Sequence, residues 1–246
     1  MMPLSKPALP AIPSGLLLIN KPRGWRSFDV VRYFQHMTSM KKIGHSGTLD
    51  EAATGLMVLA FGKDTSSLST LINYPKSYLF RMVLGSASDT LDTQGSKWTW
   101  SKVCLEDISE EHLKHCIKDK FTGTIDQIPP IFSCLKKDGK RLHEYARKGQ
   151  DVSIEPRKIT LHSLRLIALI KQSYYPQLVL EVHCSSGTYI RSLARDLGAC
   201  FGLKSHLADL CRCSIGPFHF SQALPPRAIK SITELKQSLI SSQGLS

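Results

Sequence analysis

A carboxylate on a glycine-bounded loop is the feature of this sequence best placed to do chemistry. Residues 44–50 read Gly-His-Ser-Gly-Thr-Leu-Asp, and Asp50 stands just before the apolar run 54–61. The two glycines allow tight backbone turns. An Asp held beside buried backbone can act as an acid, a base or a nucleophile. On spacing alone, the commoner role of such an Asp is to hydrogen-bond a turn, so both interpretations stay open at this point.

Four side chains near the end of the chain invite a zinc interpretation: His206, Cys211, Cys213 and His219. The Cys-x-Cys spacing differs from the Cys-x-x-Cys pair of common structural zinc sites, and no second pair accompanies it. On a strand, the two cysteines would share one face as small apolar residues. Neither a phosphate-binding loop nor a Gly-x-Ser-x-Gly elbow occurs. We therefore expect no metal site and no ordinary serine-hydrolase chemistry.

Positive charge is concentrated in two stretches. The chain has 32 Lys and Arg against 20 Asp and Glu, a formal net charge of +12. Residues 14–46 hold six cations against one acid, and residues 136–158 hold eight against four. One such stretch is usually a solvated face, but two in a basic chain favour a polyanionic partner such as nucleic acid or an anionic membrane. The cations we expect on an RNA-binding surface are Lys21, Lys136, Lys140, Arg141, Arg147 and Lys148.

The apolar pattern predicts the elements that must position these residues. Strands are predicted at residues 15–20, 54–61, 76–85, 159–169 and 177–183. Helices are predicted to begin at caps formed by Ser27, Ser109 and Ser231, and at residues 142–148 and 188–200. Because strands and helices alternate without a regular βαβα order, the prediction is an α+β fold with a largely antiparallel, mixed sheet flanked by helices.

The domain organisation is predicted to be simple. Residues 1–14 hold four prolines and one lysine, with no apolar stretch typical of a signal peptide, and are expected to form an extended lead-in. Residues 15–246 are expected to form a single domain that ends in a helix at about 231–241. No run approaches the ~20 apolar residues of a membrane-spanning helix. The seven cysteines are scattered and odd in number, so we expect reduced thiols in a cytoplasmic protein.

Several ordered motifs resemble the TruB family of tRNA pseudouridine synthases. The first block is Leu-Leu-Leu-Ile-Asn-Lys-Pro at residues 16–22, followed by residues 44–50 and by Ala-Thr-Gly at 53–55. Lys-Ser-Tyr at 76–78 is similar to the family's Lys-x-Tyr motif, and Ser-Asp-Thr-Leu-Asp at 88–92 to its Thr-Asp-Thr-x-Asp segment. Further similar blocks lie at 127–130, 142–149, 187–191, 196–198, 206–207 and at Leu210. The resemblance covers residues 15 to about 220.

The resemblance implies a pseudouridine synthase-like catalytic domain and assigns roles to particular residues. Asp50 would be the catalytic aspartate, Tyr78 would stack on the target base, and Arg191 would pair with Asp50. His45, Tyr189 and Leu210 would line the nucleotide pocket. The reaction exchanges no atoms with solvent overall and involves no redox step, so no cofactor is implied.

Three departures from the family pattern stand out. Glu51 follows Asp50 where the family usually has proline, and we expect its side chain to point away from that of Asp50. Cys211 stands where the family's usual Leu-Arg-Arg has its first arginine. About 25 residues follow the last motif, too few for the C-terminal RNA-binding domain of the PUA type found in many relatives, so no such domain is expected.

The function implied by the resemblance is the isomerisation of uridine to pseudouridine at position 55 in the T-arm loop of tRNA. The expected protein is a monomer without an obligate protein partner or a membrane association. Two alternatives remain: a tRNA-folding chaperone, which needs no Asp50, and a pseudouridine synthase with a different RNA target.

Overall fold

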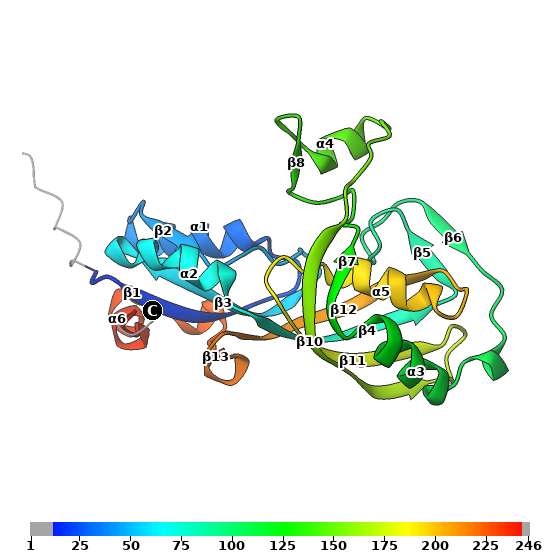
Figure 1. The fold of residues 1–246 in the computed structure, drawn as a ribbon. Coiled ribbons are helices and arrows are strands. Elements are labelled where there is room, and N and C mark those ends of the chain that lie inside the picture. The colour runs from blue at the N-terminus through cyan, green and yellow to red at the C-terminus, as the bar shows by residue number, and fades with distance from the viewer. Residues whose placement is uncertain (1–11, 243–246) are drawn as a thin grey trace, which may run out of the picture. The chain divides into compact units, whose positions relative to one another are not determined.

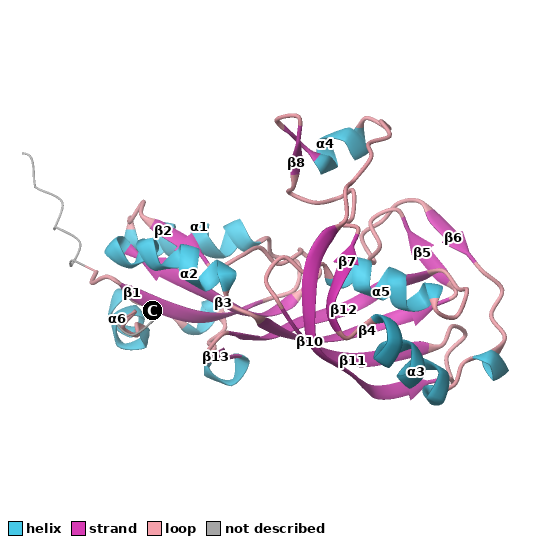
Figure 2. Ribbon diagram, viewed as in Figure 1, coloured by secondary structure: helices cyan, strands magenta, loops and turns pink. Residues whose placement is uncertain are grey.

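The computed structural model describes residues 12–242. The chain divides into two compact units, one formed by residues up to Tyr74 together with those from Ser214 onward, and one formed by Pro75–Cys213. Figure 1 follows the elements along the chain by colour, and Figure 2 shows that both units combine helices with strands. Most of the predicted lead-in lies outside the described residues, and the single domain predicted for 15–246 stays a prediction.

The first unit is built around an antiparallel pair of buried strands. β1 (Gly15–Lys21) pairs with β3 (Thr54–Phe61), and β2 (Ile43–His45) also pairs with β3. Alternate residues of β1 and β3 enter two clusters, as the twofold side-chain period of a strand requires. One cluster includes residues of α1 (Ser27–Thr38) and α6 (Ile232–Ser238). The other includes residues of α2 (Leu68–Asn73) and β13 (Phe218–His219).

The start of α1 and the end of α6 differ from the prediction. Ser27 does not cap α1, because its hydroxyl bonds Leu49 and the Asp29 carboxylate accepts from the Arg26 N–H instead. The last helix stops at Ser238, short of residue 241. Beyond it, Ile240 exchanges two backbone hydrogen bonds of 2.8 Å with Leu16 of β1, which requires extended backbone.

The second unit carries a sheet with the strand order β12, β4, β11, β10, β7, in which the pairs from β4 to β7 are antiparallel. These strands are β12 (Ser205–Ile215, whose last two residues belong to the first unit), β4 (Lys76–Leu84), β11 (Gln177–Cys184), β10 (Arg157–Ile170) and β7 (Gly123–Gln127). The predicted alternation of β4 is confirmed, since Tyr78, Phe80, Met82 and Leu84 are all buried. The α+β class and the largely antiparallel sheet are therefore confirmed.

Shorter elements complete the second unit. Helix α3 (Glu110–Lys120) is capped by Ser109, as predicted, and α5 (Ile190–Ala199) buries most of its side chains. Two small hairpins pair β5 (Ser86–Ser88) with β6 (Trp98–Trp100), and β8 (Lys136–Lys137) with β9 (Lys140–Arg141). α4 (Leu142–Arg147) follows β9 directly. Among residues 12–242, no helix has the length and apolar character needed to cross a bilayer.

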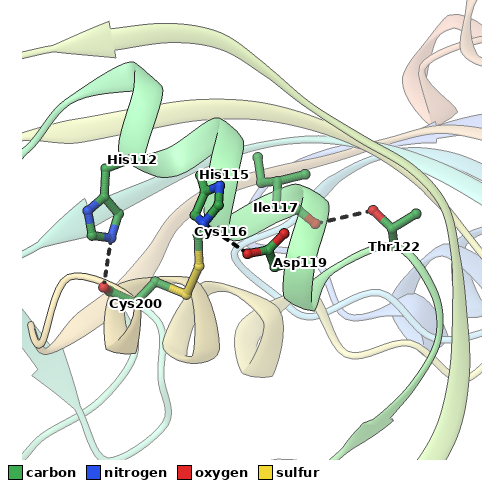
Figure 3. Close-up of a disulfide and its surroundings, with 7 residues drawn as sticks. All are labelled: His112, His115, Cys116, Ile117, Asp119, Thr122 and Cys200. Atoms are coloured by element: carbon green, nitrogen blue, oxygen red, sulfur yellow. Dashed lines mark hydrogen bonds and ion pairs between the residues drawn. A yellow bond between two sulfur atoms is a disulfide. The ribbon is translucent and has the colours of Figure 1, made fainter.

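The expectation of reduced thiols is wrong for one pair of cysteines. Cys116 of α3 and Cys200, just after α5, form a disulfide across 84 residues of sequence (Figure 3). His112 of the same helix lies beside it, with Nε2 3.1 Å from the Cys200 carbonyl oxygen. Only the packing of α3 against the end of α5 brings these cysteines together, so spacing along the chain gave no sign of the bond.

Candidate active site

The loop that carries Asp50 is fixed on both sides of that residue. On the preceding side, the Ser27 hydroxyl accepts from the Leu49 N–H at 2.8 Å and donates to its carbonyl at 3.1 Å. On the following side, the Glu51 carbonyl accepts from the Gly24 N–H at 2.9 Å, and the Asp50 carbonyl accepts from the Ala53 N–H. The Asp50 side chain itself is half-buried. The first unit therefore presents this carboxylate from a rigid turn, as a reacting group requires.

Lys21 corrects one prediction. It was expected on an RNA-binding surface, but its side chain is completely buried. Its ammonium donates to three backbone carbonyls, those of Pro22 at 3.1 Å, Trp25 at 2.6 Å and Glu51 at 3.3 Å. A buried ammonium needs such acceptors because water no longer solvates it. Lys21 thus holds the Asp50 loop against the end of β1 and cannot contact a phosphate.

His45 and Glu51 lie on either side of the same turn. The backbone N–H of Gly47 donates to His45 Nδ1 at 3.2 Å, which makes Nδ1 an acceptor and leaves Nε2 to carry the proton of the neutral ring. Gly47 has a φ of +121°, a conformation that favours glycine. The Glu51 carboxylate is exposed and forms an ion pair with Arg26 Nε at 3.4 Å on the protein surface.

Tyr78 and Leu210 lie on neighbouring strands of the second unit, β4 and β12, and both are buried. Arg212, two residues beyond Leu210, is also fully buried and makes a side-chain hydrogen bond with Tyr78. Lys76 is buried at the start of β4, and its pKa is lowered to about 8, first by burial and then by the charge of Arg212. The pair of buried cations beside Tyr78 was not predicted from the sequence.

Arg191 lies at the start of α5 with a buried guanidinium. It donates to the carbonyl oxygens of Thr90 at 2.9 Å and Phe132 at 3.0 Å, and its Nε is 3.8 Å from the Asp92 carboxylate. Arg191 therefore ties two loops of the second unit to α5. Asp50 belongs to the first unit, so its predicted pairing with Arg191 stays a prediction.

Tyr189 precedes Arg191 and is held through its backbone. Its N–H donates to Gln127 Oε1 at 2.9 Å, and Gln127 Nε2 donates to its carbonyl at 3.1 Å. Burial raises the pKa of the Tyr189 phenol above its ordinary value, so at neutral pH the phenol keeps its proton. A half-buried neutral phenol can both donate and accept a hydrogen bond.

The candidate zinc ligands have other contacts. His206 Nδ1 lies 2.9 Å from the Ser86 carbonyl oxygen, and the ring meets that of Trp98 edge-on. Burial lowers the pKa of His206, which favours its neutral form. The Cys213 thiol donates to the carbonyl of Cys211. Across the described part of the chain, no group of three or more His, Cys, Asp or Glu residues is arranged to hold a metal ion.

The remaining predicted RNA-binding cations are exposed on one segment of the second unit. Lys136 lies on β8, Lys140 and Arg141 on β9, Arg147 at the end of α4 and Lys148 directly after it. A tight turn of Asp138 and Gly139, both with positive φ, joins the two strands. We call residues 136–148 the basic segment; Figure 1 shows it beyond the ends of β7 and β10.

Comparison with known proteins decides the family. Residues 35–190 match the profile described as TruB family pseudouridylate synthase (N terminal domain). The chain belongs to the TruB family of pseudouridylate synthases. This TruB-family chain is 41% identical over 230 residues to tRNA pseudouridine synthase B of Protochlamydia amoebophila, covering 92% of this chain and 83% of that protein. It is 40% identical over 212 residues to the protein of the same name from Corynebacterium diphtheriae, covering 86% and 70%.

Solved structures share the fold of this TruB-family chain. A chain from the crystal structure of a Cbf5–Nop10–Gar1 complex superposes with a TM-score of 0.66 at 22% identity and covers 92% of this chain. A chain from an H/ACA RNP bound to a substrate RNA containing 2′-deoxyuridine gives a TM-score of 0.62, also at 22% identity. The present chain spans 60% and 58% of the lengths of those two chains. At this identity the likeness establishes the fold alone.

Two residues of this TruB-family chain that sequence reasoning did not place in the site are Asp92 and Arg212. Asp92 belongs to the segment that resembles the family's Thr-Asp-Thr-x-Asp motif, which was a usable signal. Its carboxylate accepts from the Thr90 hydroxyl at 2.6 Å and the Gln94 N–H at 2.9 Å, besides lying near Arg191. Arg212 stands at the second arginine of the family's Leu-Arg-Arg motif, which was also a usable signal, although an arginine on an alternating strand normally faces solvent.

Proposed function

We propose that this protein isomerises uridine to pseudouridine at position 55, in the T-arm loop of tRNA. The observation that carries the proposal is the 41% identity to a tRNA pseudouridine synthase B over nearly the whole chain. The rigid turn that presents Asp50 and the exposed basic segment support it. We further propose that the protein acts as a cytoplasmic monomer, with tRNA as its partner.

The chemistry needs one carboxylate. Forming pseudouridine breaks the bond between C1′ and N1 of uridine, turns the uracil, and joins C5 to C1′. Asp50 either attacks C1′ as a nucleophile, or removes the C2′ proton as a base to give a glycal. In the glycal route Asp50 returns the proton to C2′ as C5 joins C1′. In either route C5 loses one proton and N1 gains one, so substrate and product are isomers and no cofactor is required.

The other predicted residues have roles that suit their types. The aromatic face of Tyr78 would hold the uracil while it rotates. Tyr189, with its phenol protonated at neutral pH, can hydrogen-bond the nucleotide. His45 stands on the Asp50 turn, where its Nδ1 accepts from the Gly47 N–H, and would line the pocket; Leu210 would provide an apolar wall.

Access to the target base requires RNA deformation. A uridine stacked in a folded loop must flip out before its C1′ can be reached, at a cost of a few kcal/mol. Phosphate contacts offset that cost because each releases condensed counterions. The five exposed cations of the basic segment are the part of the described surface that we propose makes these contacts.

The test uses Asp50→Asn with Glu51→Gln as the matched control. Both changes replace a carboxylate by an amide of nearly the same shape, one residue apart. We expect Asp50→Asn to form no pseudouridine on unmodified tRNA while binding it normally, and Glu51→Gln to convert it like the wild type. The measurement is position-resolved mapping of pseudouridine, with affinity measured in parallel.

Three results would contradict the proposal. Normal conversion by Asp50→Asn would make Asp50 a structural residue. Binding without conversion by the wild type would favour a tRNA chaperone. Pseudouridine at another position, or only in another RNA, would favour a synthase with a different target.

A further inference from the structure

The surface of the first unit carries aromatic and cationic side chains in contact with one another, close to the turn that presents Asp50. The guanidinium carbon of Arg32 lies 4.9 Å from the centroid of the Phe28 ring, one turn earlier in α1 (Figure 1). That of Arg227 lies 5.9 Å from the centroid of the Trp25 ring. Phe28 is 52% exposed, and both arginines are exposed. We call Trp25, Phe28, Arg32 and Arg227 the α1 patch.

Two parts of the chain that are far apart in sequence meet in the α1 patch. The Trp25 ring lies 5.8 Å from the ring of Tyr33, which is also on α1. The Tyr33 hydroxyl donates to the Ile229 carbonyl at 3.2 Å, two residues after Arg227. The segment that carries Arg227 is therefore held against α1, and the side chains of the patch form one surface of the first unit.

Short contacts also tie the α1 patch to the Asp50 turn. The buried Lys21 ammonium donates to the carbonyls of both Trp25 and Glu51, at 2.6 and 3.3 Å. Arg26, next to Trp25, pairs with the carboxylate of Glu51, next to Asp50. The nucleotides on either side of a uridine held at Asp50 would therefore come within reach of the patch.

The side chains of the α1 patch suit RNA whose bases are unstacked. A uridine that flips out of a loop leaves its neighbours without a stacking partner, and such bases stack on aromatic rings and on guanidinium planes. Within residues 12–242, neither Arg32 nor Arg227 forms an ion pair with a carboxylate, so both charges are available to phosphates. A guanidinium that stacks on a ring keeps its N–H edge for such contacts.

The exposure of Phe28 is hard to explain by stability. A ring that is more than half exposed on the outer face of a helix contributes little apolar burial to the fold. An exposed pair of an arginine and an aromatic ring contributes only about 0.5 to 1 kcal/mol. A ligand that covers the ring would give it a further role.

We propose that the α1 patch binds the nucleotides that flank the target uridine, by stacking on an unstacked base and by contacting its phosphates. The proposal rests on the proposed function, in which the uridine is held at Asp50. It assigns RNA contacts to the first unit, in addition to those of the basic segment in the second.

The experiment measures the affinity of Phe28→Ala, Arg32→Gln and Arg227→Gln for an isolated T-arm hairpin and for full-length tRNA over a series of salt concentrations. Each variant also carries Asp50→Asn, so that no substrate is converted during the measurement. Each arginine variant should bind the hairpin about three- to tenfold more weakly and lower the slope of log affinity against log salt by about 0.7 to 1. Phe28→Ala should bind at least about fivefold more weakly with an unchanged slope, because stacking releases no counterions.

The matched control is Lys63→Gln in the same Asp50→Asn background. Lys63 is an exposed cation of the same unit, in the short helix η1 (Gly62–Ser67) that leads into α2. Residues of α2 pack in a different apolar cluster from those of α1. The control should bind the hairpin with the parent affinity and salt slope. Thermal unfolding identifies any variant that has lost its fold, and the three variants test the proposal separately.

The outcomes separate this proposal from the proposed function. Parent affinity for all three patch variants, or losses no larger than that of Lys63→Gln, would overturn the proposal. A loss seen with full-length tRNA but not with the hairpin would also overturn it, because the contacted nucleotides would then lie outside the T arm. If the wild type forms no pseudouridine, the proposed function fails, and the hairpin affinities still decide whether the patch binds RNA.

Discussion

Lys76 and Cys184 face one another across β4 and β11, and burial shifts their proton affinities in opposite directions. Burial is the largest cause of the lowered pKa of Lys76, about 8, and of the raised pKa of Cys184, about 11. In both cases the uncharged form is favoured, because a low-dielectric interior penalises charge of either sign. The Cys184 thiol lies 3.7 Å from the Lys76 carbonyl, to which it donates.

The Lys76 shift predicts a pH-dependent stability. Between about pH 8 and 10.5 the unfolded chain holds the Lys76 proton and the folded chain has released it, so the free energy of unfolding rises with pH across this window. The rise amounts to about 3 kcal/mol. The raised pKa of Cys184 lowers the free energy of unfolding as the pH rises above 9, which opposes the effect of Lys76. The wild type must therefore be compared with Lys76→Met, which keeps Cys184. Urea unfolding at several pH values measures the difference, and a difference independent of pH would refute the assignment.

At the scale of elements, the basic segment is the part of the second unit that we propose contacts the phosphates of tRNA. Its turn, strands and short helix display cations outward, so changes there should leave the sheet intact. We expect Lys140→Glu with Arg141→Glu to weaken tRNA binding and to reduce the slope of log affinity against log salt by about 1 to 2. The control is Lys118→Glu with Lys120→Glu, two exposed cations of α3 in the same unit. Equal salt slopes for both double variants would exclude the basic segment as a phosphate contact.

The disulfide between α3 and the end of α5 predicts a stability effect. Cross-linking residues 84 apart restricts the unfolded chain, and such bonds typically contribute about 2 to 4 kcal/mol. Cys116→Ser with Cys200→Ser should lower the free energy of unfolding by that amount. A reducing agent should destabilise the wild type similarly and leave the double variant unchanged. Equal stability of the wild type with and without reductant would count against the bond.

Features that depend on neighbouring residues could be predicted from the sequence, whereas contacts between residues far apart in the sequence could not. The strands at β1, β3 and β4 and the cap of α3 by Ser109 were predicted because local pattern and propensity decide them. The burial of Lys21, the Cys116–Cys200 bond and the contact of Arg212 with Tyr78 were not. Each depends on at least one contact between residues far apart in the sequence, such as that of Lys21 with the Glu51 carbonyl, and no local pattern records such a partner. The family motifs are the basis for proposing Asp50 and Arg191 as site residues, since spacing alone would have left them as a turn residue and a surface cation.

At the scale of the whole molecule, β12 belongs to both compact units. A strand that continues from one unit into the other makes independent unfolding of either unit costly, so we expect one cooperative transition. Circular dichroism and tryptophan fluorescence should give coincident midpoints in urea. Two separated transitions, or two stable fragments after limited proteolysis, would contradict the single domain predicted from the sequence.

The pairing of β1 with Ile240 has a consequence for how the protein is made. Leu16 and Ile240 lie near opposite ends of the described chain, so the outer edge of β1 emerges from the ribosome long before its partner does. Until residue 240 has been made, that edge lacks this partner and offers backbone donors and acceptors to any passing strand. The second unit, which is continuous in sequence, is complete earlier. Newly made chains should therefore be most prone to aggregate, and most in need of chaperones, in the interval before residue 240 becomes available to pair with β1.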